Sequence, residues 1–422
     1  MEELILGYDL CNDYCRISCY EPGQLEPVDL AFSEEEHPYV VQTAVCKKRE
    51  KDEWLLGEEA YKLVLTGEGI LVDKLIRLAG KEGTATIENR CYSARELLCI
   101  FLKLTLRQTF EKYGTRRIRM LVITVQTMNL QLLDTLVSCT DALRIPRERV
   151  HIISHTESYM YYVTSQRKEL WAHKAVMFDL NSEGLQYYEL GMTRGVSPNV
   201  ARVEREALEE GFSLDILEHP SGRKLADSIM LSCGERMMQK KLISSVYLTG
   251  RGMERCQEWA GEFLKMACQK RRVFLCENLF AKGAVYAACD YVREKTAYPY
   301  VGLCEGRIQS TVTMDVMHQG KKKKLVLAAE GGNWYETKSV VDVILDDMNA
   351  LFLTVTKHGE RSGRVVEIPL QNFPSRPNRT TRISVMLTFT SERDVTVRVV
   401  DRGFGEFFPT EDAMIKQEIH LA

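Results

Sequence analysis

Two apolar segments of this sequence end in the same way. LILGYDL occupies residues 4–10 and AVMFDL occupies residues 175–180, and each ends in Asp-Leu before a short polar turn and a second apolar run. Continuous apolar runs of this length are typical of buried strands. The pattern therefore predicts two buried strands that carry an acid, Asp9 or Asp179, at the same point near the strand's end.

The elements that follow these two strands are predicted in the same order. Each strand forms a hairpin with the next apolar run and is followed by a third strand, and then by helix, strand, helix, strand and helix. A repeated order of elements indicates an internal structural duplication. The predicted lobes are residues 1–170, with an insert at about 33–92, and residues 171–295, with an insert at about 203–240.

Within this order, three helical segments bear on the argument. Ser93-Ala94-Arg95-Glu96 is a capping box, so a helix is predicted from Ser93 to about Tyr113, where Gly114 ends it. Two further segments, residues 57–80 and 204–218, are predicted to be helical.

From about Thr296 the pattern changes to strands that alternate between apolar and polar residues. This period of two, with turns of Gly, Asn and Asp, predicts an antiparallel β domain at residues 296–422. The run Lys321–Lys324 is expected to be a solvated hairpin tip. Phe404, Phe407 and Phe408 surround two glycines, and we expect them to be packed rather than exposed.

Composition limits the partners and the compartment. The chain is 45% apolar and 27% charged, with a formal net charge of -3, so no bulk attraction to nucleic acid or to an anionic membrane is expected. Its first residues are acidic where a secretion signal is basic, and no apolar run is long enough to span a membrane. Its 13 cysteines are odd in number. Reduced thiols in the cytoplasm are therefore predicted.

Five segments resemble the motifs of the actin-like ATPase superfamily, which includes actins, sugar kinases and DnaK-type chaperones. GYDLCNDYC and FDLNSEG resemble its two phosphate loops, and VYLTGRGME is similar to its adenosine motif. HTESYMYY and ENLFAKGAVYAA are similar to its two connecting helices, and small residues in the second let the halves pack closely. The resemblance implies a duplicated actin-like (ribonuclease H-like) fold of two lobes, with ATP bound between them.

The C-terminal part favours the DnaK-like branch of this superfamily. Actins and sugar kinases lack a trailing β domain, whereas residues 378–409 resemble an uncharacterised domain of DnaK-like proteins from Firmicutes. The segment at residues 57–80 is also similar to the DnaK segment that places a lysine near the terminal phosphate. Lys74 would be that lysine.

The resemblance assigns roles to residues of these segments. It implies that Asp9 and Asp179 hold water molecules around a Mg²⁺ ion on the phosphates of ATP, and that Glu157 positions the attacking water. The residues implied to be catalytic are Glu157, Asp179 and Lys74. The residues implied to contact ATP are Asp9, Leu10, Cys11, Asn12, Asn181, Ser182, Gly184, Gly250, Arg251 and Gly252.

Ordinary structural explanations stay open for the same residues. An Asp can cap a turn through its own backbone, and an acid such as Glu157 is favoured in the first turn of a helix by the helix dipole. Lys74 could be a surface lysine, and a single Gly-x-Gly at residues 250–252 is weak evidence for a nucleotide.

Both phosphate loops depart from the family's pattern. The first normally continues with glycine and hydroxyl residues, where Cys11, Asn12 and Asp13 stand in this chain. The second normally has three glycines, whereas Asn181, Ser182 and Glu183 precede Gly184. Extra Cβ atoms and acids beside a polyphosphate argue against efficient hydrolysis.

Two functions are consistent with these features. The first is a DnaK-like protein that binds ATP weakly, hydrolyses it slowly at most, and engages a protein partner or unfolded peptide through its β domain. The second is a scaffold or interaction protein that has lost nucleotide binding. A sugar kinase is disfavoured because no motif supplies a base or a sugar-binding insert.

Overall fold

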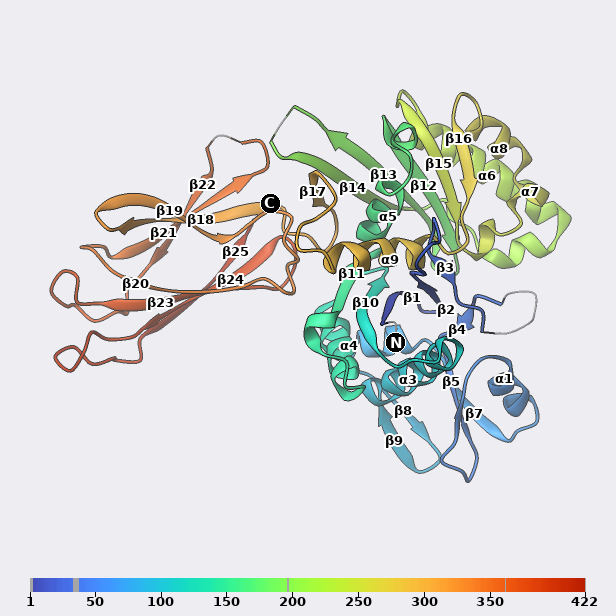
Figure 1. The fold of residues 1–422 in the computed structure, drawn as a ribbon, viewed down its shortest axis with the longest axis horizontal. Helices are drawn as coiled ribbons and strands as arrows, with labels where there is room; N and C mark the ends of the chain where they lie inside the picture. Colours follow the sequence, from blue (N-terminus) through green and yellow to red (C-terminus); the bar gives the residue numbers. More distant parts are fainter. Residues whose placement is uncertain (1–2, 33–37, 196, 361, 422) are drawn as a thin grey trace. The chain divides into compact units, whose positions relative to one another are not determined.

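A computed structural model describes residues 3–32, 38–195, 197–360 and 362–421 (Figure 1). The chain forms two compact units. The first unit runs to Thr193 and includes Ala201–Pro299, and the second comprises residues 194–200 and the chain from Tyr300 onward. The mixed α/β architecture with a β-rich C-terminal region is confirmed.

The first sheet of the first unit is built around the strand that carries Asp9 near its end. Strand β1 pairs antiparallel with β2 and parallel with β10, which pairs parallel with β11. The strand order is β11-β10-β1-β2-β3, and β4 pairs with β2. The bounds are β1 Leu4–Leu10, β2 Tyr14–Cys19, β3 Val28–Asp29, β4 Val41–Gln42, β10 Ile118–Val125 and β11 Val150–Ser154.

Three helices accompany this sheet. Helix α3 (Ala94–Tyr113) has the predicted capping box at Ser93 and ends at Gly114, whose φ is 63°. Helix α4 (Leu130–Ala142) packs against α3, and α5 (His155–Thr164) starts directly where β11 ends. The side chains of Ser93, Asn129 and Ser154 cap the N-termini of these three helices.

The insert of the first lobe corrects one prediction. The single helical segment predicted at residues 57–80 is wrong, because β7 divides it into α1 and α2. Strand β7 pairs antiparallel with β5, so tertiary pairing overrides the helical pattern. The elements are β5 Val45–Lys48, β6 Trp54–Leu55, α1 Gly57–Leu65, β7 Gly69–Val72, α2 Leu75–Ala79, β8 Thr84–Ile87 and β9 Arg90–Ser93.

The second sheet repeats the strand order of the first. Within the first unit its order is β16-β15-β12-β13-β14, so in both sheets the fifth and fourth strands precede the first, second and third. Strand β12 pairs antiparallel with β13 and parallel with β15. The bounds are β12 Lys174–Asn181, β13 Gly184–Thr193, β14 Asn199–Leu208, β15 Ile243–Thr249 and β16 Arg272–Leu275.

The helices of the second lobe include one further correction. Residues 204–208 belong to β14, so the helix predicted at 204–218 is wrong there, and the only helical part is η3. The strand continues through these residues because β14 is hydrogen-bonded to β13 in the second sheet, so tertiary pairing overrides the helical pattern. The bounds are η3 Leu214–Glu218, α6 Pro220–Met238, η4 Arg251–Met253, α7 Cys256–Trp259, α8 Gly261–Ala267 and α9 Leu279–Tyr291.

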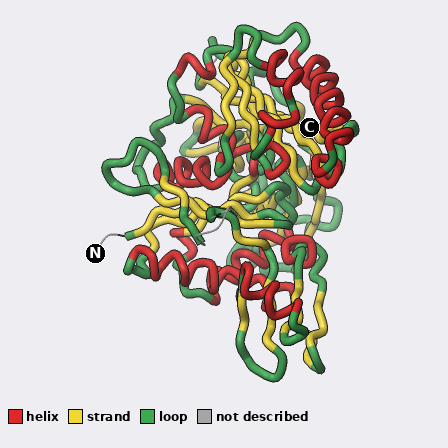
Figure 2. The backbone as a smooth tube through the Cα atoms, turned by 90° about the vertical axis from the view of Figure 1, so that its right-hand side faces the viewer, coloured by secondary structure: helices red, strands yellow, loops and turns green. Residues whose placement is uncertain are grey.

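Helix α9 lies close to both α5 and β1, and helices flank the strands of the first unit (Figure 2). A Cβ atom on Gly283 would lie 2.1 Å from the carbonyl oxygen of Ser158 in α5. A Cβ atom on Gly7 would lie 2.2 Å from the carbonyl oxygen of Ala281 in α9. Glycine at these two positions therefore permits the close approach of backbones.

The second unit contains two four-stranded antiparallel sheets, ordered β19-β18-β21-β22 and β20-β23-β24-β25. The last strand, β25, was not predicted from the sequence. The bounds are β17 Tyr300–Leu303, β18 Ser310–His318, β19 Lys321–Ala328, β20 Lys338–Ile344, β21 Ala350–Lys357, β22 Arg364–Pro369, β23 Arg382–Phe389, β24 Asp394–Asp401 and β25 Met414–His420.

The sequence analysis predicted the exposure of two groups of side chains in this unit. Lys321–Lys324 are exposed, as predicted, although they begin β19 rather than form a loop. Phe404 and Phe407 are 40% and 93% exposed, so the expectation that these rings are packed is wrong. The turn after β24 folds back through the backbone pairing of Phe404 with Phe408, and this pairing leaves the Phe407 ring outside.

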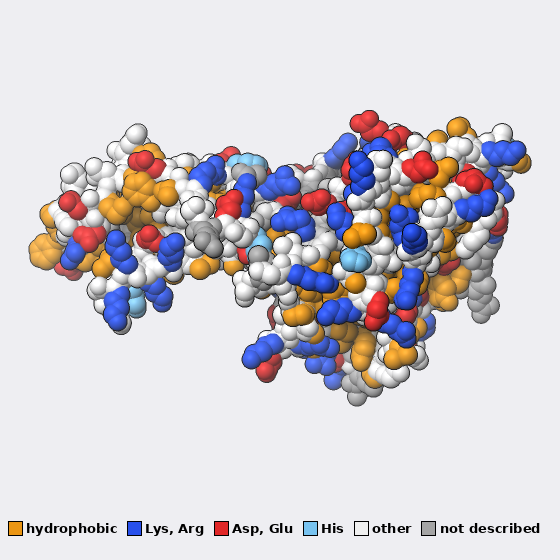
Figure 3. Space-filling model, turned by 90° about the horizontal axis from the view of Figure 1, so that it is seen from above, with side chains coloured by type: hydrophobic (Ala, Val, Ile, Leu, Met, Phe, Trp, Pro, Cys, Tyr) orange, Lys and Arg blue, Asp and Glu red, His pale blue; other side chains and the backbone are white. Residues whose placement is uncertain are grey.

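Basic and acidic side chains are interspersed on the face drawn in Figure 3, in keeping with the small net charge of -3. All 13 cysteines are free thiols, and eight of them are buried. Among the described residues, no helix combines the length and the apolar character that crossing a membrane requires.

Candidate functional site

Asp9 and Asp179 occupy equivalent positions in the two sheets. Asp9 pairs with Thr124 on its parallel neighbour β10, and Asp179 pairs with Thr249 on its parallel neighbour β15. Both acids are buried, with exposed fractions of 2% and 1%. Because buried carboxylates need partners, the groups around them decide what this site can do.

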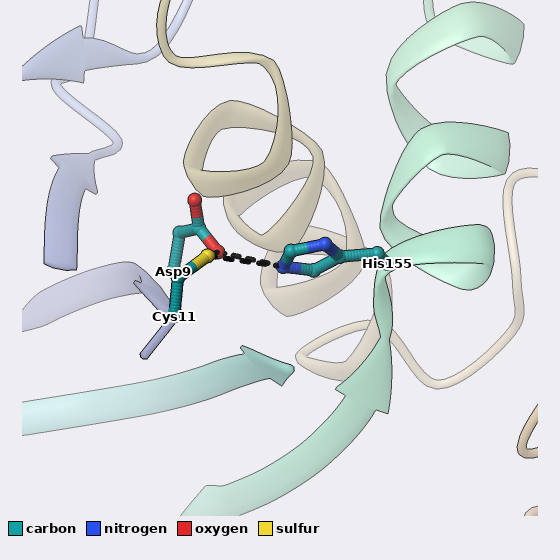
Figure 4. Close-up of side chains that lie close together, drawn as sticks. All are labelled: Asp9, Cys11 and His155. Atoms are coloured by element: carbon teal, nitrogen blue, oxygen red, sulfur yellow. Dashed lines mark hydrogen bonds and ion pairs between the residues drawn. The ribbon is translucent and has the colours of Figure 1, made fainter. Parts of the chain in front are cut away.

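Asp9 has two partners, Cys11 and His155 (Figure 4). His155 Nε2 lies 2.8 Å from Asp9 Oδ1, and the Cys11 thiol donates to the same oxygen at 3.5 Å. His155 directly follows the last residue of β11, and this position directs its imidazole toward Asp9. The imidazole also stacks on the Phe280 ring, with the ring centroids 3.8 Å apart. The carboxylate is thus held by groups of its own lobe.

Asp9, Cys11 and His155 form a buried hydrogen-bonded group. Burial raises the pKa of Cys11 well above its usual range, and the charges of Asp9 and Asp179 raise it further, so the thiol keeps its proton. The three donor atoms lie within 4.8 Å of one another and are of the kinds that zinc accepts. However, His155 Nδ1 is buried without the hydrogen-bond partner that metal-bound histidines usually have.

Asp179 is held less completely. Asn181 Nδ2 donates to its Oδ2 at 3.1 Å, while its buried Oδ1 has no hydrogen-bond partner. Burial raises the pKa of Asp179 to about 6, with His155 lowering this pKa and Asp9 raising it. The two protonation states of this carboxyl are therefore equally populated near pH 6.

The glycines of the predicted adenosine motif pack against this acid. Gly250 has a φ of 90°, and a Cβ atom there would lie 2.3 Å from the Leu180 carbonyl oxygen and 2.5 Å from Asp179 Oδ1. A Cβ atom on Gly252 would lie 2.5 Å from the Leu180 side chain. The close packing of this turn on β12 is enough to require both glycines.

Arg16 is a buried cation beside both acids, and the sequence-based reasoning missed it. It pairs with Asp9 across the β1–β2 ladder, and its charge lowers the pKa of Asp179. Its guanidinium donates to Glu254 Oε1 at 2.9 Å and to the carbonyl oxygen of Glu277, both in the second lobe. We call Asp9, Cys11, Arg16, His155 and Asp179 the buried polar cluster.

The two polar turns are brought together beside this cluster. Asn12 Nδ2 donates to the Glu183 carboxylate, and Asn12 Oδ1 accepts from the Arg77 backbone at 2.9 Å. Burial and Glu183 raise the pKa of Asp13, whereas Arg251 and Lys74 lower it, so these charges lie near one another. The other predicted site residues differ in exposure: Lys74 and Ser182 are exposed, whereas Leu10 is buried. Gly184 has a φ of 102°.

Glu157, the residue predicted to position the attacking water, lies in the first turn of α5. Its carboxylate is fully buried and accepts a hydrogen bond from the Tyr291 hydroxyl at 3.1 Å. Its backbone N–H is capped by Ser154, and the residue of α5 that contacts Asp9 is His155. An arginine inside the apolar strand YCRISC and a histidine at a strand–helix junction were the signals available for Arg16 and His155.

The fold and the site together define a class: an α/β unit of two sheets, with a buried polar cluster where their first strands end, and a β-rich unit after it. Residues 26–305 match the C-terminal model of a family of unknown function (DUF5716). Residues 307–421 match a domain of unknown function (DUF8552). The first match covers more than half of the chain, which therefore belongs to that family. No curated protein matches the sequence.

Proposed function

We propose that the first unit is an actin-like module of the DnaK-like kind whose cleft no longer uses nucleotide, and that the protein acts by binding a protein partner. The equal strand order of the two sheets supports the actin-like assignment. So do the equivalent positions of Asp9 and Asp179, each beside a threonine on the neighbouring parallel strand.

The buried polar cluster is the observation that carries the loss of nucleotide. A Mg²⁺ ion with its water shell needs carboxylates that are free to accept from those waters. Asp9 Oδ1 instead accepts from His155 and Cys11, and the Arg16 guanidinium supplies the positive charge beside both acids. A thiol, an imidazole and a guanidinium do not fit a magnesium site.

The turns add a second obstacle. An entering triphosphate would have to break the hydrogen bond between Asn12 and Glu183, and would then face Asp13 and Glu183. Two like charges about 4 Å apart repel by roughly 4 kcal/mol at the effective dielectric constant of a protein surface. Lys74 and Arg251 offset part of this repulsion. Weak ATP binding with slow hydrolysis is the second candidate, favoured by the two acids lying at the ends of equivalent strands.

One sheet face of the second unit supports a protein partner. Val326, Thr313, Thr354 and Val365 form one row across β19, β18, β21 and β22. Phe352 lies two residues from Thr354 and shares its face. The side chains of Val326, Phe352 and Val365 are exposed. These three exposed apolar side chains on one face are the candidate protein-binding surface of the second unit.

Calorimetric titration of the full chain with Mg-ATP tests the loss of nucleotide. We expect no binding heat up to millimolar concentration, and no rise of the melting temperature with ATP. Saturable binding that is lost in Asp179→Ala would contradict the proposal and favour the second candidate. A circular dichroism spectrum of each sample shows that the titrated protein is folded.

A further inference from the structure

We propose that a pocket of the first unit, separate from the buried polar cluster, binds an anionic amphiphile, a small molecule with an apolar body and a carboxylate or phosphate head. The pocket lies between the second half of α3, the start of β10, and the segment that connects α4 to β11. Its volume is about 500 Å³, and none of its lining residues belongs to the buried polar cluster. Small-molecule sites typically have volumes of roughly 300–1,000 Å³.

The floor of this pocket is apolar. Leu106 of α3, Ile118 of β10 and Ile145 are buried, and Phe110 and Leu143 are half-buried beside them. Binding on this floor would remove the hydrocarbon part of a ligand from contact with water, which is favourable for apolar surface. The floor therefore accounts for the apolar half of the ligand.

The rim of the pocket is basic. Its lining includes one acidic side chain and six basic ones, which are Lys103, Arg107, Arg116, Arg117, Arg144 and Arg149. Arg107 pairs with Glu111, and Arg149 pairs with Glu3 and donates to the Ile118 carbonyl oxygen. The other four basic side chains make no ion pair or side-chain hydrogen bond within the described part of the chain.

Six cations around one pocket are unexpected in a chain whose net charge is -3. Their mutual repulsion is relieved when an anion binds among them. Guanidinium groups also match carboxylate and phosphate oxygens in a bidentate geometry. The combination of an apolar floor with unpaired cations at its rim therefore selects a ligand that carries both properties in one molecule.

A small molecule fits the site better than a protein segment. An amphipathic helix docks through anchors spaced over several turns and needs a long groove. The floor here is short, because it is formed by two residues of α3, one of β10 and two of the connecting segment. We therefore assign the site to a free amphiphile or to a single lipid, which present the same chemistry.

The direct test is calorimetric titration of the full chain with octanoate, decanoate and decyl phosphate below their micellar concentrations, and with decanol below its solubility limit. We expect saturable 1:1 binding of decanoate and decyl phosphate. The two extra methylenes of decanoate should tighten its binding over octanoate by roughly tenfold. Decanol lacks the charge and should bind about tenfold more weakly than decanoate.

Charge variants locate the binding. The triple variant Lys103→Gln, Arg116→Gln, Arg117→Gln changes exposed side chains without ion-pair partners, and should weaken decanoate binding by about tenfold or more. The matched control Lys321→Gln, Lys322→Gln, Lys323→Gln removes the same charge from the second unit and should bind as the wild type does. Equal losses in both triple variants, or no saturable binding of either anion, would overturn the assignment.

Two further arms distinguish the source of the ligand. Phosphatidylglycerol vesicles that bind the protein and release it to decyl phosphate would identify a membrane lipid, whereas binding of decanoate without vesicle binding would identify a free amphiphile. Either result supports the site. An acidic amphipathic peptide that binds this rim while decanoate does not would refute the proposal and assign the surface to a protein.

Discussion

Asp179 shows how a single buried side chain can make stability depend on pH. Its Oδ1 has no partner, and burial raises its pKa from an ordinary value near 3.9 to about 6. The folded state therefore binds a proton that the unfolded state has lost at pH values between about 4 and 6. Stability from this residue is present below that window and falls as the pH rises through it.

Replacing the acid should remove this dependence. Asp179→Asn cannot ionise, and its amide oxygen can still accept from Asn181. At pH 7.5 we expect the variant to be more stable than the wild type by about 2–3 kcal/mol, with a smaller difference at pH 4.5. Urea unfolding at the two pH values, followed by circular dichroism, measures both differences. A variant less stable than the wild type at pH 7.5 would show that the charged carboxylate is needed.

At the scale of elements, the crossing of α5 and α9 depends on close backbone contact. Gly283 faces the Ser158 carbonyl oxygen, and the Ser158 hydroxyl donates to the Phe280 carbonyl oxygen at 2.6 Å. The crossing also contains the Phe280 ring on which His155 stacks. Packing of α9 therefore fixes the position of the imidazole beside Asp9.

A methyl group at this crossing should be destabilising. Gly283→Ala would place Cβ 2.1 Å from a backbone oxygen, so we expect a loss of about 1–3 kcal/mol or more in the free energy of unfolding. Gly261→Ala is the matched control, because nothing lies within 4 Å of its Cβ position at the start of α8. This control should be neutral or more stable by up to about 1 kcal/mol. Equal stability of the two variants in urea would refute the close crossing.

At the scale of the whole molecule, the proposed function assigns different roles to the two compact units. The first unit keeps Asp9 and Asp179 buried, with Asp9 held by His155, while the second exposes apolar side chains on one sheet face. Partner binding is therefore tested with variants of the second unit.

The exposed sheet face should bind unfolded polypeptide. Val326→Thr, Phe352→Thr and Val365→Thr together remove apolar surface and place threonine, a β-branched residue suited to strands, at all three positions. We expect this triple variant to bind a fluorescent, reduced and alkylated polypeptide about tenfold more weakly than the wild type, measured by anisotropy. The control Leu25→Ser, Leu65→Ser, Leu242→Ser changes exposed residues of the first unit and should leave binding unchanged. Unaltered binding by the Thr variant would exclude this face.

The sequence by itself determined the features that depend on neighbouring residues. The capping box at Ser93, the apolar strands that end in Asp9 and Asp179, and most strands of the β-rich unit follow from local periodicity and turn chemistry. The departure of both turns from a glycine-rich pattern was also visible. Such signals report burial and backbone conformation over a few residues.

Only the tertiary structure decided which distant groups meet. Arg16 and Glu254 are 238 residues apart, His155 and Asp9 are 146 apart, and no local pattern records either contact. The pairing of β7 with β5, the need for Gly250 beside Asp179, and the basic pocket between α3 and β10 have the same origin. Packing of distant segments set these features, because a side chain's partners depend on where the whole chain places them.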